Sequence, residues 1–176
     1  GCRVVGIAGS AAKLDYLRSL GVDAVVSHRS EFFVQELRAA CPDGCDIYFE
    51  NVGGGVFEAV LPLLNRGARI SLCGLISQYG NVDGEDSRSQ WRVQGEAIFQ
   101  RQGVLVHDLF VGNFVADYQE RFLQEMGAYV REGEVCYLED KRAGLKHAPE
   151  VFAQMLQGDN FGKTLIAVSD DPTLTD

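Results

Sequence analysis

Short apolar runs alternate with amphipathic runs along the first half of the chain. The apolar runs are rich in β-branched and aromatic residues and end in Gly or small polar residues, as buried strands do; they cover Arg3–Ala8, Ala24–Ser27, Ile47–Phe49 and Arg69–Cys73. Between them, apolar residues recur every three or four positions, which is typical of helices. Strict alternation of strand and helix predicts an α/β fold with a doubly wound parallel sheet.

Three helices fill the intervals between these strands. The first covers Ala11–Leu20 and the third covers Val56–Leu64, where Pro62 marks a kink or a short helix. We expect Ser30 to cap the second helix. The residues expected to face inward from the second helix are Phe33, Val34 and Leu37, and those from the third are Phe57, Val60, Leu61 and Leu64. Asn65–Gly67 is expected to close the third helix before the next strand.

The alternation loosens after Tyr79, where a polar loop spans Gly80–Asp86. The pattern beyond it predicts a helix over Ser87–Gln102, a strand over Val104–Val111, a helix over Asp117–Arg131, a strand over Cys136–Asp140, a helix over Ala143–Leu156 with Pro149 as its weak point, and a strand over Lys163–Val168. We place a domain change near Asn113, which gives segments 1–113 and 114–176.

Charge and composition exclude several kinds of partner. The 176-residue chain carries a formal net charge of −9 without basic runs, which argues against nucleic acid and anionic membrane surfaces. Its apolar runs are too short to span a bilayer, and no secretory signal is visible. The five widely spread cysteines are expected to be free thiols in a reducing cytoplasm. The three histidines lie in no ligand-spaced motif, so we expect no metal site.

The strand tips are the candidate ligand site, because ligands bind beyond the carboxyl ends of parallel strands. The first tip, Gly9–Ser10 followed by Lys13, lacks the carboxylate with which NAD sites usually bind the ribose 2′-hydroxyl. A hydroxyl, free N–H groups and a cation would instead hold the 2′-phosphate of NADP. His28-Arg29 adds donors at the same edge. An ordinary helix start with a solvated lysine remains the alternative.

Two further turns, Asn51–Gly54 and Gly74–Tyr79, follow neighbouring strands. Their glycines permit close approach of a ligand to the backbone, although tight strand-to-helix turns use glycine in the same way. The phenol of Tyr79 could donate to a ribose or a substrate carbonyl, or be merely structural. The Gly-x-Gly-x-x-Gly fingerprint and the nucleophile elbow are both absent from the sequence. The predicted topology would also fit a doubly wound methyltransferase. The combination of these two turns argues against that alternative.

Six segments together resemble the NADP-dependent alkenal/one oxidoreductases, a group of zinc-independent medium-chain dehydrogenase/reductases. These segments are Gly6–Ser10 with Lys13, Cys41–Gly44, Tyr48–Gly54, Ala68–Ile70, Cys73–Tyr79 and Asn160–Lys163. The resemblance covers nearly the whole chain, up to about Val168. It implies an NADP(H) cofactor and hydride transfer from NADPH to the β-carbon of an α,β-unsaturated ketone or aldehyde, with the protein supplying position and electrostatics.

The resemblance also implies roles for individual residues. Ser10, Lys13 and His28 would hold the 2′-phosphate, and Tyr79 would be the catalytic residue at the nicotinamide ribose or the substrate carbonyl. The other implied cofactor contacts are Asn51, Val52, Cys73, Gly74, Ile76, Ser77, Leu109, Phe110, Val111 and Asn160. Glu50 stands where the group more often has Asp or Asn, and His107–Leu109 replaces a more usual Gln-Gly-Phe.

The family has an amino-terminal GroES-like catalytic domain and a first Rossmann strand before the point where this chain opens. The resemblance therefore implies an incomplete NADP-binding Rossmann domain over 1–113, lacking its first strand, and a segment over 114–176 that returns to the catalytic domain and exposes apolar surface without it. We expect the isolated chain to be inactive, and a homodimer to form through the edge strand at Val104–Phe110. Quinone reduction on the same scaffold and a non-catalytic nucleotide-binding module are the alternatives.

Overall fold

The computed structural model describes residues 1–80 and 86–170, and the chain divides into two compact units, Gly1–Ala116 and Asp117–Asp176. The strands and helices alternate as the sequence pattern predicted, and every pair of hydrogen-bonded strands is parallel among the described residues. Residues 81–85 of the expected polar loop lie outside the described part of the chain. The predicted α/β class is confirmed.

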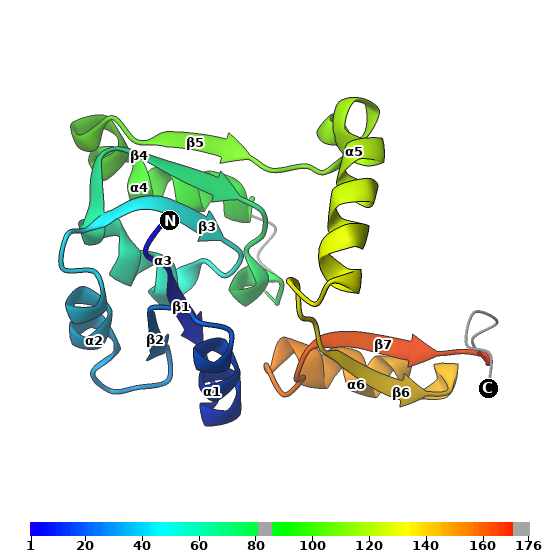
Figure 1. Ribbon diagram of the computed structural model, residues 1–176. Helices are drawn as coiled ribbons and strands as arrows, with labels where there is room; N and C mark the ends of the chain where they lie inside the picture. Colours follow the sequence, from blue (N-terminus) through cyan, green and yellow to red (C-terminus); the bar gives the residue numbers. More distant parts are fainter. Residues whose placement is uncertain (81–85, 171–176) are drawn as a thin grey trace. The chain divides into compact units, whose positions relative to one another are not determined.

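The first unit carries five strands in two parallel sheets (Figure 1). Strand β1 pairs with β2, and β4 lies between β3 and β5. The elements are β1 (Val5–Ala8), α1 (Ala11–Ser19), β2 (Ala24–Ser27), α2 (Phe33–Ala40), β3 (Cys45–Glu50), α3 (Gly54–Val60), the 3-10 turn η1 (Leu61–Leu63), β4 (Leu64–Leu72), the 3-10 turn η2 (Ile76–Gln78), α4 (Ser87–Gln102) and β5 (Leu105–Asp108).

Helix α5 (Gly112–Arg131) begins in the first unit and continues into the second. The rest of the second unit is β6 (Glu139–Ala143), the 3-10 turn η3 (Leu145–His147), α6 (Ala148–Leu156) and β7 (Lys163–Ala167), with β6 and β7 paired in parallel. No residue of α5 is buried, and its apolar side chains are exposed: Phe114, Val115, Tyr118, Phe122, Leu123, Tyr129 and Val130. The apolar surface expected in this part of the chain is therefore present.

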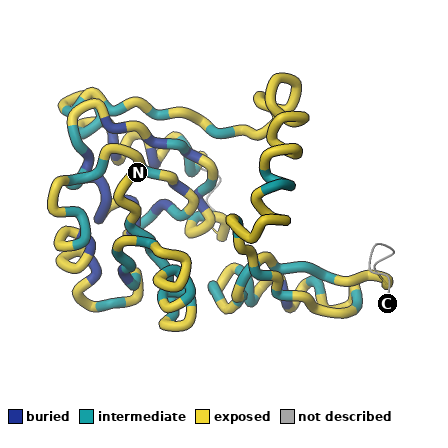
Figure 2. The backbone as a smooth tube through the Cα atoms, viewed as in Figure 1, coloured by how far each residue is buried: buried dark blue, intermediate teal, exposed yellow. Residues whose placement is uncertain are grey.

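The core of the first unit lies between β4 and the helices α3 and α4. Alternate residues of β4 point into it, and Ile70 and Leu72 are completely buried. Phe57 of α3 stacks on Trp91 of α4 with ring centroids 4.4 Å apart, and both side chains are inaccessible to solvent. Figure 2 shows this burial along β4 and α3. Each large side chain buried here stabilises the fold by roughly 1.5–3 kcal/mol.

The opposite face of the same three-stranded sheet is open within the first unit. Ile47 and Phe49 of β3 and Leu105 of β5 are all more than half exposed. The register places Phe49 beside Ser71 of β4, which pairs in turn with His107 of β5. Parallel sheets are normally covered on both faces, so the exposure of these apolar side chains is unusual for such a sheet.

Two expectations for the second helix are wrong. Ser30 does not cap α2, because the helix begins at Phe33 without a side-chain cap. The hydroxyl of Ser30 accepts from Phe32 N at 3.1 Å and donates to Glu36 at 2.9 Å. Val34 is exposed, whereas Phe33 and Leu37 are buried. A helix that starts at Phe33 places residues four apart on its inner face and turns the next residue about 100° away from it.

The sequence also misplaced the boundary between the third helix and its strand. Val60 ends α3 and Pro62 lies in the 3-10 turn that follows, so the short helix is confirmed and the kink is not, while Leu61 and Leu64 lie beyond the helix in which they were expected. Asn65–Gly67, however, belongs to β4 because Leu64 pairs with Cys45. The register then shifts before Ile47 pairs with Arg69. This irregularity depends on pairing with another strand, which local periodicity does not report.

The starts of β6 and α6 also differ from the bounds predicted from the sequence. The strand expected at Cys136–Asp140 begins at Glu139, because β6 is defined by its pairing with β7. The helix expected from Ala143 begins at Ala148, since Gly144 adopts a φ of 91° and starts a 3-10 turn instead. Pro149, expected as a weak point, lies in the first turn of α6, where its missing N–H is harmless.

Candidate functional site

The carboxyl ends of β3 and β4 are tied together by backbone hydrogen bonds. Cys73 N and Gly74 N donate to the carbonyl of Glu50 at 2.9 and 3.1 Å. Ile76 N and Ser77 N continue the pairing, at 3.0 Å each, to the carbonyls of Asn51 and Val52. The hydroxyl of Ser77 also donates to the Val52 carbonyl. The two turns singled out in the sequence therefore lie side by side at the sheet edge.

Glycine is required where these turns approach each other. Gly53 and Gly54 have φ values of 74° and 54°, in the left-handed region that other residues avoid. A Cβ atom on Gly54 would lie 3.2 Å from the hydroxyl oxygen of Ser77, and one on Gly53 would lie 3.1 Å from the side chain of Leu75. The close packing of the two tips thus depends on the absence of side chains.

A buried carboxylate lies beneath the first turn. Glu50 is fully inaccessible, and its Oε1 accepts from Val52 N at 2.6 Å and from Gly53 N at 2.9 Å. Its Oε2 accepts from the indole of Trp91 at 3.2 Å. Burial, followed by the neighbouring charge of Glu50 and a hydrogen bond to it, raises the pKa of Tyr48 well above its usual value. The sequence flagged Glu50 only as a departure, and it gave no sign of Trp91, which lies 41 residues away.

A cationic cluster lies at the tips of β1 and β2. Ser10 is the N-cap of α1, and its hydroxyl accepts from Lys13 N at 3.4 Å. A Cβ atom on Gly9 would lie 2.7 Å from His28 Nε2 and 3.1 Å from Arg29 Nε, so both side chains lie over this turn. Partial burial, then Arg29 and, more weakly, Lys13 lower the pKa of His28. Donors and positive charge gathered at a helix N-terminus can hold a phosphate.

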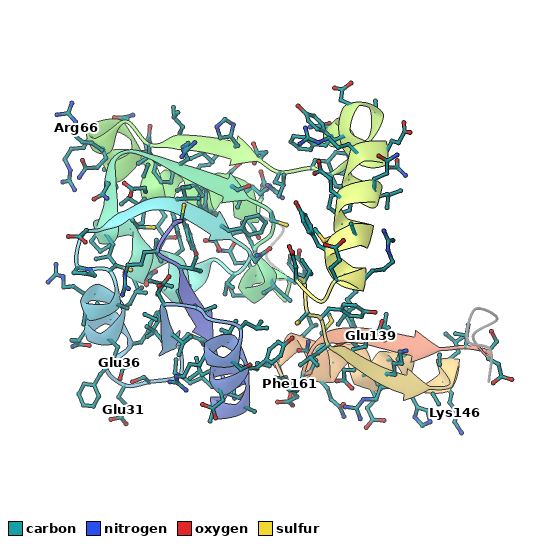
Figure 3. All side chains as sticks on the ribbon, in the orientation of Figure 1. Glu31, Glu36, Arg66, Glu139, Lys146 and Phe161 are labelled. Atoms are coloured by element: carbon teal, nitrogen blue, oxygen red, sulfur yellow. The ribbon has the colours of Figure 1, made fainter. Side chains whose placement is uncertain are left out.

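The tip of β5 is joined to the tip of β4 by an arginine that the sequence did not single out. Arg88 Nη1 contacts Asp108 at 3.0 Å, and its Nη2 donates to the carbonyl of Cys73 at 3.3 Å. Arg92 also pairs with Asp108, at 2.6 Å. Leu109 N donates to the carbonyl of Leu72 at 2.9 Å, which extends the pairing to Leu109, the first of three consecutive cofactor contacts implied by the resemblance. Figure 3 draws the side chains of these strands on the ribbon, with Arg66 labelled at the other end of the same sheet, near the start of β4.

The remaining candidate residues are exposed or lie in the second unit. Tyr79, Phe110 and Val111 expose 65%, 66% and 73% of their surface, so they are open to a ligand. The hydroxyl of Tyr79 lies beside Gly74, 3.5 Å from where its Cβ would be. Asn160 belongs to the second unit, where its amide donates to the carbonyl of Gly162 at 2.9 Å and supports a turn.

The described residues contain neither a cluster of metal-ligating side chains nor a helix that could span a membrane. Within residues 1–80 and 86–170, no group of three or more His, Cys, Asp or Glu side chains is arranged to hold a metal ion. In the same part of the chain, no helix combines the length and the apolarity needed to cross a membrane.

Parallel strands with glycine-rich tips, together with a helix N-terminus that carries Ser10 and Lys13, are features of a Rossmann-type dinucleotide-binding fold. The family model described as zinc-binding dehydrogenase matches residues 1–127. The chain therefore belongs to the zinc-binding dehydrogenase family, and its relatives include a 2-alkenal reductase, prostaglandin reductases and a curcumin reductase.

Three relatives illustrate the match. The chain is 41% identical to the NADPH-dependent curcumin reductase of Escherichia coli over 97% of its own length and 50% of that protein. It is 37% identical to the NADP(+)-dependent 2-alkenal reductase of Nicotiana tabacum, covering 96% of this chain and 48% of that one. The crystal structure of CurA from Vibrio vulnificus in complex with NADPH superposes with a TM-score of 0.83 at 39% identity, over 97% of this chain and 51% of that one. The chain thus spans about half the length of the relatives that it matches.

Proposed function

We propose that this chain supplies the NADP(H)-binding part of an oxidoreductase that reduces the C=C bond of α,β-unsaturated ketones and aldehydes. The observation that carries the proposal is the pairing of the β3 and β4 tips, in which Asn51 and Val52 bind the backbone of Ile76 and Ser77. The cations Lys13 and Arg29, with the imidazole of His28 between the strand tips, support a cofactor with a 2′-phosphate. The similarity to NADPH-dependent reductases supports the substrate class.

The residues present fit this cofactor. Ser10 offers a hydroxyl, Lys13 a cation and His28 an imidazole N–H, and no carboxylate that would repel the 2′-phosphate comes before Asp15, which pairs with Arg18 at 2.6 Å. The backbone at the paired tips is bare enough for a dinucleotide to approach closely. Bound NADPH supplies the hydride. The further cofactor contacts that we propose are Asn51, Val52, Cys73, Gly74, Ile76, Ser77, Phe110, Val111 and Asn160.

Tyr79 is the proposed catalytic residue. Its side chain is exposed at the end of η2, next to the paired tips. A phenol at this position would donate to the nicotinamide ribose or to the carbonyl oxygen of the substrate, where negative charge develops as hydride reaches the β-carbon.

We further propose that segment 1–113 is the dinucleotide-binding part and that 114–176 returns to a catalytic domain. The exposed apolar residues of α5 support the second assignment, because such surface normally marks an interaction site.

Among the described residues, β1 pairs only with β2 and β3 only with β4. An additional strand between β1 and β3 would give the strand order of a dinucleotide-binding sheet. A cytoplasmic location and a homodimer through the free edge of β5 complete the proposal.

The test is an activity assay on two proteins. One is the 176-residue chain, and the other is a joined protein in which this chain follows the preceding half of the Escherichia coli curcumin reductase. We expect the chain alone to oxidise no NADPH with an enone, and the joined protein to reduce enones faster than quinones. Faster reduction of quinones would identify a quinone oxidoreductase. Tight NADPH binding without reduction of any acceptor would identify a binding module.

A further inference from the structure

The turn at the end of β3 is shaped from inside the protein. The side chain of Glu50 folds back under its own strand end, and Oε1 accepts from Val52 N at 2.6 Å and Gly53 N at 2.9 Å. With these two N–H groups held inward, the carbonyls of Asn51 and Val52 are free to accept from Ile76 N and Ser77 N. The backbone carbonyl of Glu50 accepts in addition from Cys73 N and Gly74 N.

The carboxylate is itself held from the far side of the core. The indole of Trp91 donates to Oε2 at 3.2 Å. Trp91 is fixed in turn by the stack on Phe57 at 4.4 Å and by Phe99 at 5.4 Å between ring centroids. A buried carboxylate is costly unless it is hydrogen-bonded, and here three donors hold it: Val52 N, Gly53 N and the indole of Trp91.

We propose that Glu50 is a positioning residue of the dinucleotide site and that Trp91 locks it in place. This inference rests on the proposed function, since it assigns the two residues to the same cofactor site. Glu50 touches neither cofactor nor substrate; it acts by fixing the turn whose outer surface receives the dinucleotide. Preformed turns of this kind strengthen binding because no ordering of the backbone is needed when the ligand arrives.

Glu50→Gln is the sharpest substitution because it keeps size and shape. The NH2 group of the new amide would point either toward Val52 N and Gly53 N or toward the indole of Trp91. All three of these groups are hydrogen-bond donors and cannot accept from it. At least one donor–donor contact results in either orientation. Glu58→Gln is the matched control: Glu58 is an exposed carboxylate on the following helix α3, and its hydrogen bond is to Gln94 at 2.8 Å and not to the turn.

The first readout needs no cofactor. In the 176-residue chain, we expect Glu50→Gln to speed hydrogen exchange of the Val52 and Gly53 amides by about tenfold or more, with no such change in Glu58→Gln. Trp91→Phe, which keeps the aromatic stack and removes one donor, is expected to give a smaller change in the same direction. It keeps the inference testable if Glu50→Gln does not fold. Unchanged exchange of both amides in Trp91→Phe and Glu50→Gln would overturn the inference.

The second readout uses the joined protein. Glu50→Gln is expected to raise the Kd for NADPH by about tenfold while the KM for the enone at saturating NADPH stays unchanged. A purely structural role would lower the melting temperature and leave the Kd unaltered, and that result would also overturn the inference. If the unsubstituted joined protein binds no NADPH, the proposed function fails, whereas the exchange of the turn amides still decides the role of Glu50.

Discussion

The hydroxyl of Ser77 donates to the carbonyl of Val52, so a side chain from the tip of β4 is fastened to the tip of β3, 25 residues earlier. The backbone N–H of Ser77 donates to the same carbonyl at 3.0 Å. One carbonyl therefore anchors both the main chain and the side chain of η2. This double contact fixes the edge at which we place the cofactor, and it leads to the first prediction.

Ser77→Ala removes the hydroxyl and leaves the backbone contact in place. Because one neutral hydrogen bond contributes about 0.5–1.5 kcal/mol net, we expect a small loss of stability and a roughly three- to tenfold weaker affinity for NADPH in the joined protein. Ser19→Ala is the control, since the hydroxyl of Ser19 likewise donates to a backbone carbonyl, that of Tyr16, at the far end of α1. Equal effects of both variants on the NADPH titration would contradict the prediction.

Lys13→Ala tests the phosphate cluster at the tip of β1. A charge-assisted hydrogen bond is worth more than a neutral one, so the Kd for NADPH should rise by about tenfold, while the Kd for NADH, which lacks the 2′-phosphate, should not change. The measurement is a titration of the joined protein with each cofactor. Arg18→Ala removes a cation from the same helix, one that pairs with Asp15, and should change neither value. A parallel loss for both cofactors would exclude a role at the phosphate.

His28 makes stability depend on pH on the acidic side. Partial burial and the nearby charges of Arg29 and Lys13 hold its pKa below the usual value of 6.5. The unfolded chain therefore takes up the proton first, so the stabilising contribution is complete above pH 6.5 and is lost as the pH falls through the folded-state pKa. Since the side chain is largely exposed, the loss should stay below about 1 kcal/mol.

His28→Asn should remove this part of the pH dependence. The measurement is the free energy of unfolding by urea at several pH values between neutral and about pH 5, where an ordinary histidine becomes charged. The curves of the two proteins should run together above the usual histidine pKa and diverge below it, with the variant losing less. Parallel curves throughout that interval would contradict the prediction.

Phe57→Ala tests the core beneath the site. Its ring is completely buried and stacks on Trp91, so its loss leaves a cavity and should lower the free energy of unfolding by about 3–5 kcal/mol. Val93→Ala on α4 is the control, because that side chain is 71% exposed and should change stability by less than about 0.5 kcal/mol. Urea denaturation of both variants compares them directly, and similar midpoints would show that the aromatic cluster is not the core.

The sequence by itself determined the order and type of the elements and the position of the strand tips. Apolar periodicity is a local property of the sequence. The helix at Ser87–Gln102 and the strand at Ala24–Ser27 were therefore both predicted with their observed bounds. The glycines at the end of β3 were visible because backbone turns leave their mark on neighbouring residues. The resemblance to a known family added the roles proposed for individual side chains, which no local pattern carries.

Only the tertiary structure decided which distant residues support those tips. Trp91 reaches Glu50 across 41 residues, and Arg88 reaches Asp108 across 20. In the sequence Trp91 is one more apolar residue of a helix, and Arg88 one more charge. The pairing of Leu64 with Cys45, which moved Asn65–Gly67 into β4, was hidden for the same reason. Contacts between separate elements depend on how the chain folds back on itself, and a linear pattern holds no record of that geometry.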